Sequence, residues 1–246
     1  MNTLKSPTRA VFWMLAAVAC FSLMDAGMKQ LSGSYATLQV TFLRGAASLP
    51  FVLVWVLASA GPRSLIPVRW GLHLLRGLLG MTMIGCFVFA LRSLPLSTAY
   101  TIYFVAPLLI AALSVPLLGE TVGPRRWVAI GIGLVGVLVV LRPGVDGFIS
   151  VPGLMVLLAA TAYAVAAITV SMLTRTDTPQ SMVVWFLALL ALGAGLLAIP
   201  DWQPLQWRDA GLIAGMGLAG AAGQVALTRA FQLCAASLIA PLEFTG

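Results

Sequence analysis

Two opposite charges within long apolar stretches are the residues with the clearest potential for chemistry. Asp25 and Arg44 each lie in such a stretch, and Lys29 follows Asp25 by one helical turn. An ionisable group inside a bilayer is unfavourable unless it pairs or faces water, so each is a candidate functional residue. At 1.5 Å per residue they lie about 9 and about 10 Å from the same predicted membrane surface, a depth at which they can pair. The pair could be structural, with Lys29 as a second partner of Asp25, or it could be an external-half gate or substrate contact that changes partner.

Glu243 is the other acidic residue within a predicted span. It lies two residues after Pro241, and a proline removes a backbone donor and exposes carbonyl groups that a cavity can use. A carboxylate there could take up a proton or bind a cationic group. It could equally lie near a helix end without a functional partner.

Aromatic and neutral polar side chains are the candidates for a cavity wall. Large rings with a polar tip suit a cavity for flat or amphipathic metabolites, although most rings in such a chain face lipid or a neighbouring helix. Gln224 and Thr228, at i and i+4, could hydrogen-bond a substrate or an adjacent helix. The predicted cavity residues are Phe21, Tyr100, Tyr103, Phe104, Tyr163, Gln224 and Thr228. His73 and Arg76, near the start of a span, are interpreted as interfacial.

Membrane-spanning helices must position these residues. Of the 246 residues, 61% are hydrophobic and 9% are charged, whereas soluble domains carry roughly 25% charged residues. A water-soluble globular protein is therefore excluded, and the pattern predicts an all-α polytopic membrane protein. Stretches long enough to cross a bilayer occur at roughly 11–31, 36–59, 69–91, 96–118, 126–142, 153–174, 180–199, 209–230 and from about 235 to the end.

Charge placement predicts the orientation of the chain. The net charge of +7 is spread singly along apolar segments, which argues against nucleic-acid binding. No metal or other cofactor is expected, because the cysteines lie far apart and there is one histidine. Residues 1–9 precede a retained first helix rather than a cleaved signal. Positive charges favour a cytoplasmic N-terminus, with Lys5, Arg9, Arg63, Arg69, Arg125, Arg126 and Arg175 inside and Lys29, Arg92, Arg142 and Arg208 outside.

The sequence repeats itself weakly at an offset of 140 residues. Gly71, Leu72, Gly77, Leu78, Gly80, Ala90, Ser97 and Phe104 recur as Gly211, Leu212, Gly217, Leu218, Gly220, Ala230, Ser237 and Phe244. The unit contains five helices, an odd number, so the copies (1–146 and 147–246) enter the membrane from opposite sides, as in secondary transporters. A last span of about 12 residues is too short to cross, so we expect a C-terminal truncation, with about nine of ten helices present. Glycines expected to pack helices together are Gly77, Gly80, Gly133, Gly211, Gly215 and Gly220.

Four segments resemble the EamA family of the drug/metabolite transporter superfamily. They are LRSLPLSTAYTIYFVAPLLIAALSVPLLGE at 91–120, IGIGLVGVLVVLRPG at 130–144, TFLRGAASLP at 41–50 and APLEFTG at 240–246. The resemblance implies ten helices in two inverted five-helix repeats, cytoplasmic termini, a central cavity, and transport of small organic metabolites, commonly export. The tenth helix and a second copy of the Gly119-Glu120 motif are absent from this sequence.

The sequence therefore favours a secondary transporter, predicted to export a small molecule across the cytoplasmic (inner) membrane by alternating access. Without a phosphate-binding P-loop, the predicted energy source is a proton or substrate gradient, with Asp25 and Glu243 as candidate proton sites. The alternative is a membrane-embedded enzyme acting on a lipid or peptide, for which the sequence offers no recognised catalytic motif. No particular oligomeric state is predicted.

Overall fold

The computed structural model describes residues 7–119 and 150–234, together with isolated positions between 123 and 135. This part of the chain is helical and contains no strand. Its α-helices are α1 (Pro7–Leu31), α2 (Thr37–Ser59), α3 (Trp70–Leu91), α4 (Leu96–Tyr103), α5 (Val105–Leu118), α7 (Val151–Leu173), α8 (Pro179–Ala198) and α9 (Ala210–Leu233). Short 3₁₀ turns, Pro62–Leu65, Ile199–Asp201 and Trp207–Asp209, lie in the connections.

Seven helical segments of this part are long and apolar enough to cross a membrane. They confirm the corresponding predicted spans and the prediction of a polytopic membrane protein. The predicted spans at 126–142 and from about 235 fall largely or wholly outside the described residues.

One predicted span is broken in the middle. The segment 96–118 is divided into α4 and α5 at Phe104, whose ψ of −3° departs from regular helix. Pro107 explains the break, because its ring nitrogen cannot donate to the carbonyl of Tyr103 one turn earlier. The break lies beside Tyr100 and Tyr103, at the depth of the cavity described below.

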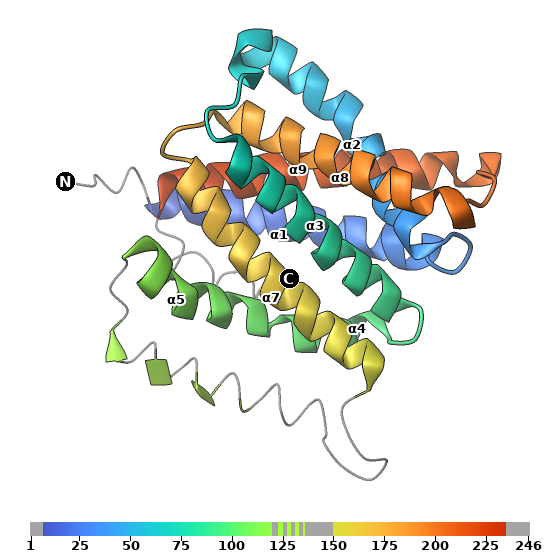
Figure 1. The fold of residues 1–246 in the computed structure, drawn as a ribbon, viewed down its shortest axis with the longest axis horizontal. Helices are drawn as coiled ribbons and strands as arrows, with labels where there is room; N and C mark the ends of the chain where they lie inside the picture. Colours follow the sequence, from blue (N-terminus) through green and yellow to red (C-terminus); the bar gives the residue numbers. More distant parts are fainter. Residues whose placement is uncertain are drawn as a thin grey trace.

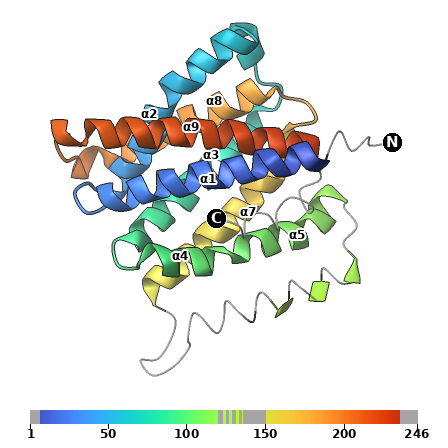
Figure 2. The same cartoon turned by 180° about the vertical axis from the view of Figure 1, so that it is seen from behind.

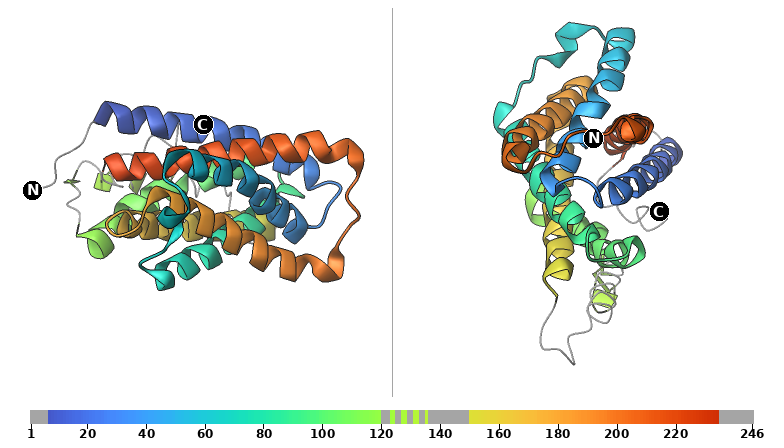
Figure 3. Two further views of the ribbon diagram at one scale, coloured as in Figure 1. Left: turned by 90° about the horizontal axis from the view of Figure 1, so that it is seen from above. Right: turned by 90° about the vertical axis from the view of Figure 1, so that its right-hand side faces the viewer.

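The helices pack in pairs that are distant in sequence. α1 lies along α9, and α3 lies along α7, while α2 and α8 pack against each other. The end view in Figure 3 also shows α1 and α9 side by side. Following the colours in Figure 1, α1, α3 and α8 run in one direction along the bundle, and α2, α7 and α9 run in the other.

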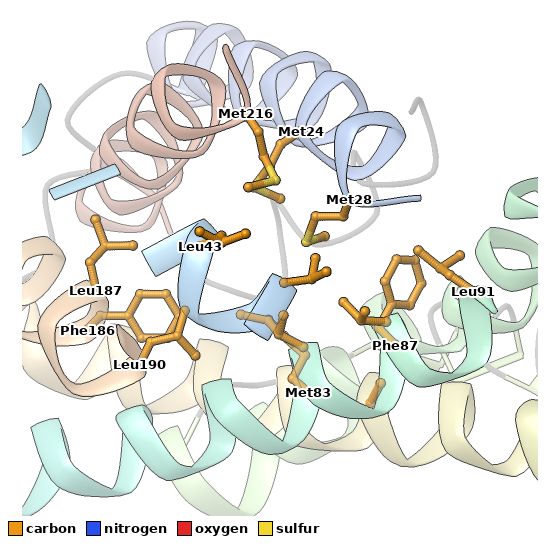
Figure 4. Close-up of a cluster of buried hydrophobic side chains, with 14 of the residues drawn as sticks. Met24, Met28, Leu43, Met83, Phe87, Leu91, Phe186, Leu187, Leu190 and Met216 are labelled. Carbon is orange, nitrogen blue, oxygen red and sulfur yellow. The ribbon is translucent and has the colours of Figure 1, made fainter. Parts of the chain in front are cut away.

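The core between these pairs is built of methionine, leucine and phenylalanine. Figure 4 shows Leu43 of α2 between methionines of α1 and α9 on one side and side chains of α3 and α8 on the other. By contrast, Phe12 and Leu57 are 65% and 69% exposed, as expected for side chains that face lipid. The bundle therefore buries one face of each helix and leaves the other apolar face outward.

Some of the predicted packing glycines lie at close helix contacts. A Cβ added at Gly77 would be 2.8 Å from Leu189 of α8, and one added at Gly220 would be 2.8 Å from Ser48 of α2. Gly80 similarly faces Phe186 of α8.

The packing prediction is wrong for Gly211 and Gly215, because no described atom lies within 4 Å of an added Cβ at either position. The buried face of α9 instead runs through Met216, Gly217 and Gly220, which places Gly211 and Gly215 on the outward face. Gly133 lies outside the described residues.

Candidate functional site

A cavity lies within the bundle, where α1, α2, α3, α7 and α9 surround the break between α4 and α5. Its volume of about 110 Å³ exceeds the 10–15 Å³ that one water requires, so it can hold several waters or part of a ligand. Its ring-bearing and polar lining residues are Phe21, Ser22, Asp25, Arg44, Phe87, Tyr100, Tyr103, Phe104, Tyr163 and Gln224. All the residues predicted for a cavity wall therefore line this cavity, except Thr228.

Thr228 is the exception because it lies one turn beyond Gln224, about 6 Å further along α9. It is fully buried, and its hydroxyl oxygen has no hydrogen-bond partner among the described residues. Phe87, a cavity residue that sequence reasoning missed, lies edge-on to Tyr103 with ring centroids 5.4 Å apart. Its apolar surroundings in α3 gave no signal that it faces a cavity.

Asp25 is held by a tyrosine rather than by an arginine. The Tyr100 hydroxyl of α4 donates to Asp25 Oδ2 at 2.9 Å, a partner that the sequence did not indicate. The predicted ion pair with Arg44 is not formed, since the salt bridges within the described part of the chain involve other residues. Instead, Asp25 is bound by Tyr100, and the Arg44 guanidinium lies over the ring of Phe21.

Lys29 also has a different role from the predicted one. Its Nζ donates to the backbone oxygens of Leu91 and Leu94, the latter at 2.9 Å. It therefore satisfies carbonyls at the C-terminal end of α3, where the helix dipole favours a cation. The prediction that it is a second partner of Asp25 is wrong.

Arg44 is a buried cation with no paired anion among the described residues. The residue is 4% exposed, lines the cavity, and has its guanidinium carbon 5.9 Å from the ring centre of Phe21. Its Nε has no hydrogen-bond partner, and it is in no salt bridge within the described residues. Asp25 lines the same cavity. The site thus presents a carboxylate and a guanidinium separately, an arrangement that suits a ligand with both charges.

His73 and Arg76 are not interfacial, as their positions near a span end suggested, but buried, with exposures of 1% and 2%. Arg76 donates from Nη1 to the Met182 carbonyl at 2.6 Å and from Nη2 to Gln224 Oε1 at 3.2 Å. Both partners are more than 100 residues away, so no local pattern could reveal them. The sequence did carry one indication that Arg76 is buried, because it lies about 9 Å along α3 from the start of the helix.

A polar network closes the end of the bundle that holds the α1–α2 and α8–α9 loops. Tyr35 donates to Asp209 Oδ2 at 2.6 Å and accepts from the Gln206 amide at 3.0 Å. The side chain of Gln39 makes two hydrogen bonds to the backbone of Gln203, at 2.6 and 2.9 Å. The hydrogen bond to Asp209 raises the pKa of Tyr35 above its ordinary value, so the tyrosine remains protonated and able to donate at neutral pH.

A second network closes the opposite end, between the α2–α3 and α7–α8 loops. Asp177 Oδ1 accepts from the Val68 amide at 2.8 Å and from His73 Nε2 at 3.0 Å. Its other oxygen accepts from Thr176 at 2.7 Å. Burial opposes ionisation of Asp177, but the hydrogen bonds from His73, Thr176 and Val68 outweigh it and lower the pKa of this carboxyl below its ordinary value.

An Asp177→Asn variant is expected to lower the free energy of unfolding in detergent by about 1–3 kcal/mol at pH 7, because hydrogen bonds to a charged acceptor are lost. Since the folded-state pKa is depressed, the wild-type advantage is complete above about pH 4 and disappears as the pH falls through the folded pKa. Unfolding measured from pH 7 to pH 2.5 tests this. The exposed Asp201 supplies the control, Asp201→Asn, which should show little change. A constant difference down to pH 2.5 would contradict the prediction.

The comparison with known proteins settles the family. The model of the EamA-like transporter family matches residues 8–142. The chain belongs to this family. It is therefore a multi-pass membrane transporter for small molecules, and the family predicted from the sequence is confirmed.

Characterised relatives are similar to the chain over almost all of its length. A riboflavin transporter of Vibrio cholerae is 28% identical, over 99% of this chain and 83% of the relative. A pseudopaline exporter of Pseudomonas aeruginosa is 27% identical, over 95% and 82%. An S-adenosylmethionine uptake transporter of Rickettsia prowazekii is 26% identical, over 99% and 82%. A solved crystal structure shares the fold, with a TM-score of 0.70 and 21% identity over 97% of this chain and 85% of the other.

Proposed function

We propose that this EamA-family transporter carries a small, flat metabolite that bears both an acidic and a basic group. The observation that carries the proposal is the cavity that Asp25 and Arg44 both line without being paired with each other. A substrate ammonium group could pair with Asp25, and a substrate carboxylate could pair with Arg44. Hydrogen bonds between such opposite charges are among the strongest in proteins.

The ring-rich wall supports a flat substrate. Tyr100 and Phe104 stack with planes 16° apart, and Tyr103 and Tyr163 lie with ring centres 5.7 Å apart. Aromatic faces favour offset stacking with a planar ring system. Two of the relatives above are named for riboflavin and S-adenosylmethionine, which makes these compounds the first natural probes.

We further propose that residues 1–146 and 147–246 are inverted repeats that exchange roles in alternating access. The helix pairing supports this. In the proposed repeat, α1 corresponds to α7 and α3 corresponds to α9, so the contact between α1 and α9 corresponds to the contact between α7 and α3, and both are observed. Two glycine contacts follow the same relation. Gly77 faces Leu189, and Gly217, which is related to Gly77 by the repeat offset, faces Ala47. Ala47 and Leu189 are themselves separated by nearly that offset. Corresponding helices also run in opposite directions, as an odd number of helices per repeat requires.

The remaining predictions concern side, direction and energy source. We propose an inner-membrane location with a cytoplasmic N-terminus, and export driven by a gradient in which a coupling proton binds Asp25. The relatives include both an exporter and an uptake transporter, so flux should be measured in both directions. Glu243, the other candidate proton site, lies outside the described residues. Membership of a transporter family favours transport over the membrane-embedded enzyme considered from the sequence.

A set of indole compounds with the same ring and different charges tests the proposed substrate class. In proteoliposomes, tryptophan is expected to compete for flux about tenfold better than tryptamine, indole-3-propionate or indole-3-propionamide, because only tryptophan satisfies both charges. Labelled tryptophan, riboflavin and S-adenosylmethionine are the transported probes. Equal competition by all four indoles would contradict a site that binds both the ammonium and the carboxylate of the substrate.

Two phenylalanines of α3 provide matched variants for the same assay. Phe87 lines the cavity and is 6% exposed, whereas Phe89 is 44% exposed. Phe87→Leu should therefore raise KM, while Phe89→Leu should leave transport unchanged. If the two variants behave alike, the cavity is not the substrate site.

A further inference from the structure

We propose that Arg76 is a positioning residue that fixes the Gln224 amide as a hydrogen-bond donor toward the substrate. The inference rests on the proposed function of the cavity and adds a selection rule: the substrate carries an acceptor, a ring nitrogen or carbonyl oxygen, where it meets α9.

Arg76 is held in one orientation from several sides. Its two terminal nitrogens donate to Met182 of α8 and Gln224 of α9. Its guanidinium carbon lies 4.5 Å from the ring centre of Phe186, and the residue is 2% exposed. A planar guanidinium bound at two points and stacked on a ring has little rotational freedom. Arg76 does not itself line the cavity, so its influence on a substrate passes through Gln224.

The bond from Arg76 decides which end of the Gln224 amide remains free. A guanidinium carries donors and no acceptor, so the group of Gln224 that faces it must be the oxygen. The amide nitrogen makes no hydrogen bond to the rest of the described chain and is not sealed away from solvent. Because Gln224 lines the cavity, its two N–H groups are free to donate to a ligand.

The cavity thereby acquires a neutral donor distinct from its two charges. Without Arg76 the amide could turn over and accept or donate equally well, and it would distinguish ligands poorly. A donor held in place disfavours a ligand that offers only C–H or N–H at that point, since the amide hydrogens then lose their partner.

The experiment compares Arg76→Met, Gln224→Met and the double variant with wild type. Arg229→Met, at an arginine of α9, is the control. Tryptophan and its 4-, 5-, 6- and 7-aza isomers are the probes, because each replaces one ring C–H with an acceptor nitrogen. We expect wild type to prefer one aza isomer over tryptophan about tenfold. Both single variants and the double variant should lose that preference to the same extent, through KM rather than the maximal rate, and the control should keep it.

A second readout is independent of any substrate. In the empty protein, the fall in unfolding midpoint of the double variant should be smaller than the sum of the single effects, because either substitution breaks the same bond. The inference would be overturned if the falls in unfolding midpoint of the two single variants added up to that of the double variant. It would also be overturned if the preference for one aza isomer survived in Arg76→Met but not in Gln224→Met, or if wild type showed no such preference. If wild type transports neither tryptophan nor S-adenosylmethionine, the compounds among the probes that carry both charges, the proposed substrate class fails instead, and the unfolding midpoints alone test the contact between Arg76 and Gln224.

Discussion

An Arg44→Gln variant is expected to transport tryptophan about 100-fold less efficiently than wild type, as measured by kcat/KM in proteoliposomes. Arg44 is 4% exposed and has no paired anion within the described residues, so the guanidinium is available for the substrate carboxylate. Removing one partner of a buried charge pair lowers affinity by about 2–5 kcal/mol, and 1.4 kcal/mol corresponds to tenfold.

The charge of the substrate should decide the size of this effect. Tryptamine lacks the carboxylate, so its competition should change little in Arg44→Gln, and the preference for tryptophan over tryptamine should disappear. Arg63 is exposed on the α2–α3 connection, which makes Arg63→Gln the matched control for loss of one positive charge. An equal loss for both ligands would indicate that Arg44 supports the fold rather than the substrate.

A Gly217→Ala substitution is the second change with a large expected effect, here on stability. The added Cβ would lie 2.5 Å from the carbonyl oxygen of Ala47 and 2.7 Å from its Cβ. The obstacle is the backbone of α2 rather than a flexible side chain, so α9 would have to move away from α2. Overpacking of this kind lowers the free energy of unfolding by about 1–3 kcal/mol, and the yield of folded protein should fall with it.

Gly215 provides a control on the same helix. An added Cβ there meets no described atom within 4 Å, and alanine has a higher helix propensity than glycine. Gly215→Ala should therefore leave the unfolding midpoint unchanged or raise it slightly. If both substitutions destabilise equally, the close approach of α9 to α2 is not what limits position 217.

The glycines show how far the repeat in the sequence could guide a structural prediction. The sequence predicted close packing for Gly211 and Gly215 and for Gly77 and Gly220 alike. Only the latter pair lies at a helix contact, because the helix must also be turned so that those residues face a neighbour. Spacing along a helix defines a face but does not say which way that face is directed.

The ion pair predicted from membrane depth shows the same limit. Depth follows from counting residues, and it predicted that Asp25 and Arg44 lie at one level; both line the same cavity. The predicted direct contact between them is not formed, and Asp25 accepts a hydrogen bond from Tyr100 of α4 instead. The break at Phe104 that ends α4 depends on Pro107 in a segment whose composition is that of an ordinary span.

The sequence by itself determined the membrane-spanning segments that the structure describes, the family, and most of the ring-bearing residues of the cavity. Each of these depends on the apolarity of a continuous stretch or on a local motif, and such properties need no knowledge of neighbours in space. Only the tertiary structure decided that Arg76 binds Gln224, that His73 binds Asp177, and that Arg44 has no paired anion in the described chain. These contacts depend on which helices adjoin and on the rotation of each about its axis, and in an almost uniformly apolar chain neither is encoded by a local pattern.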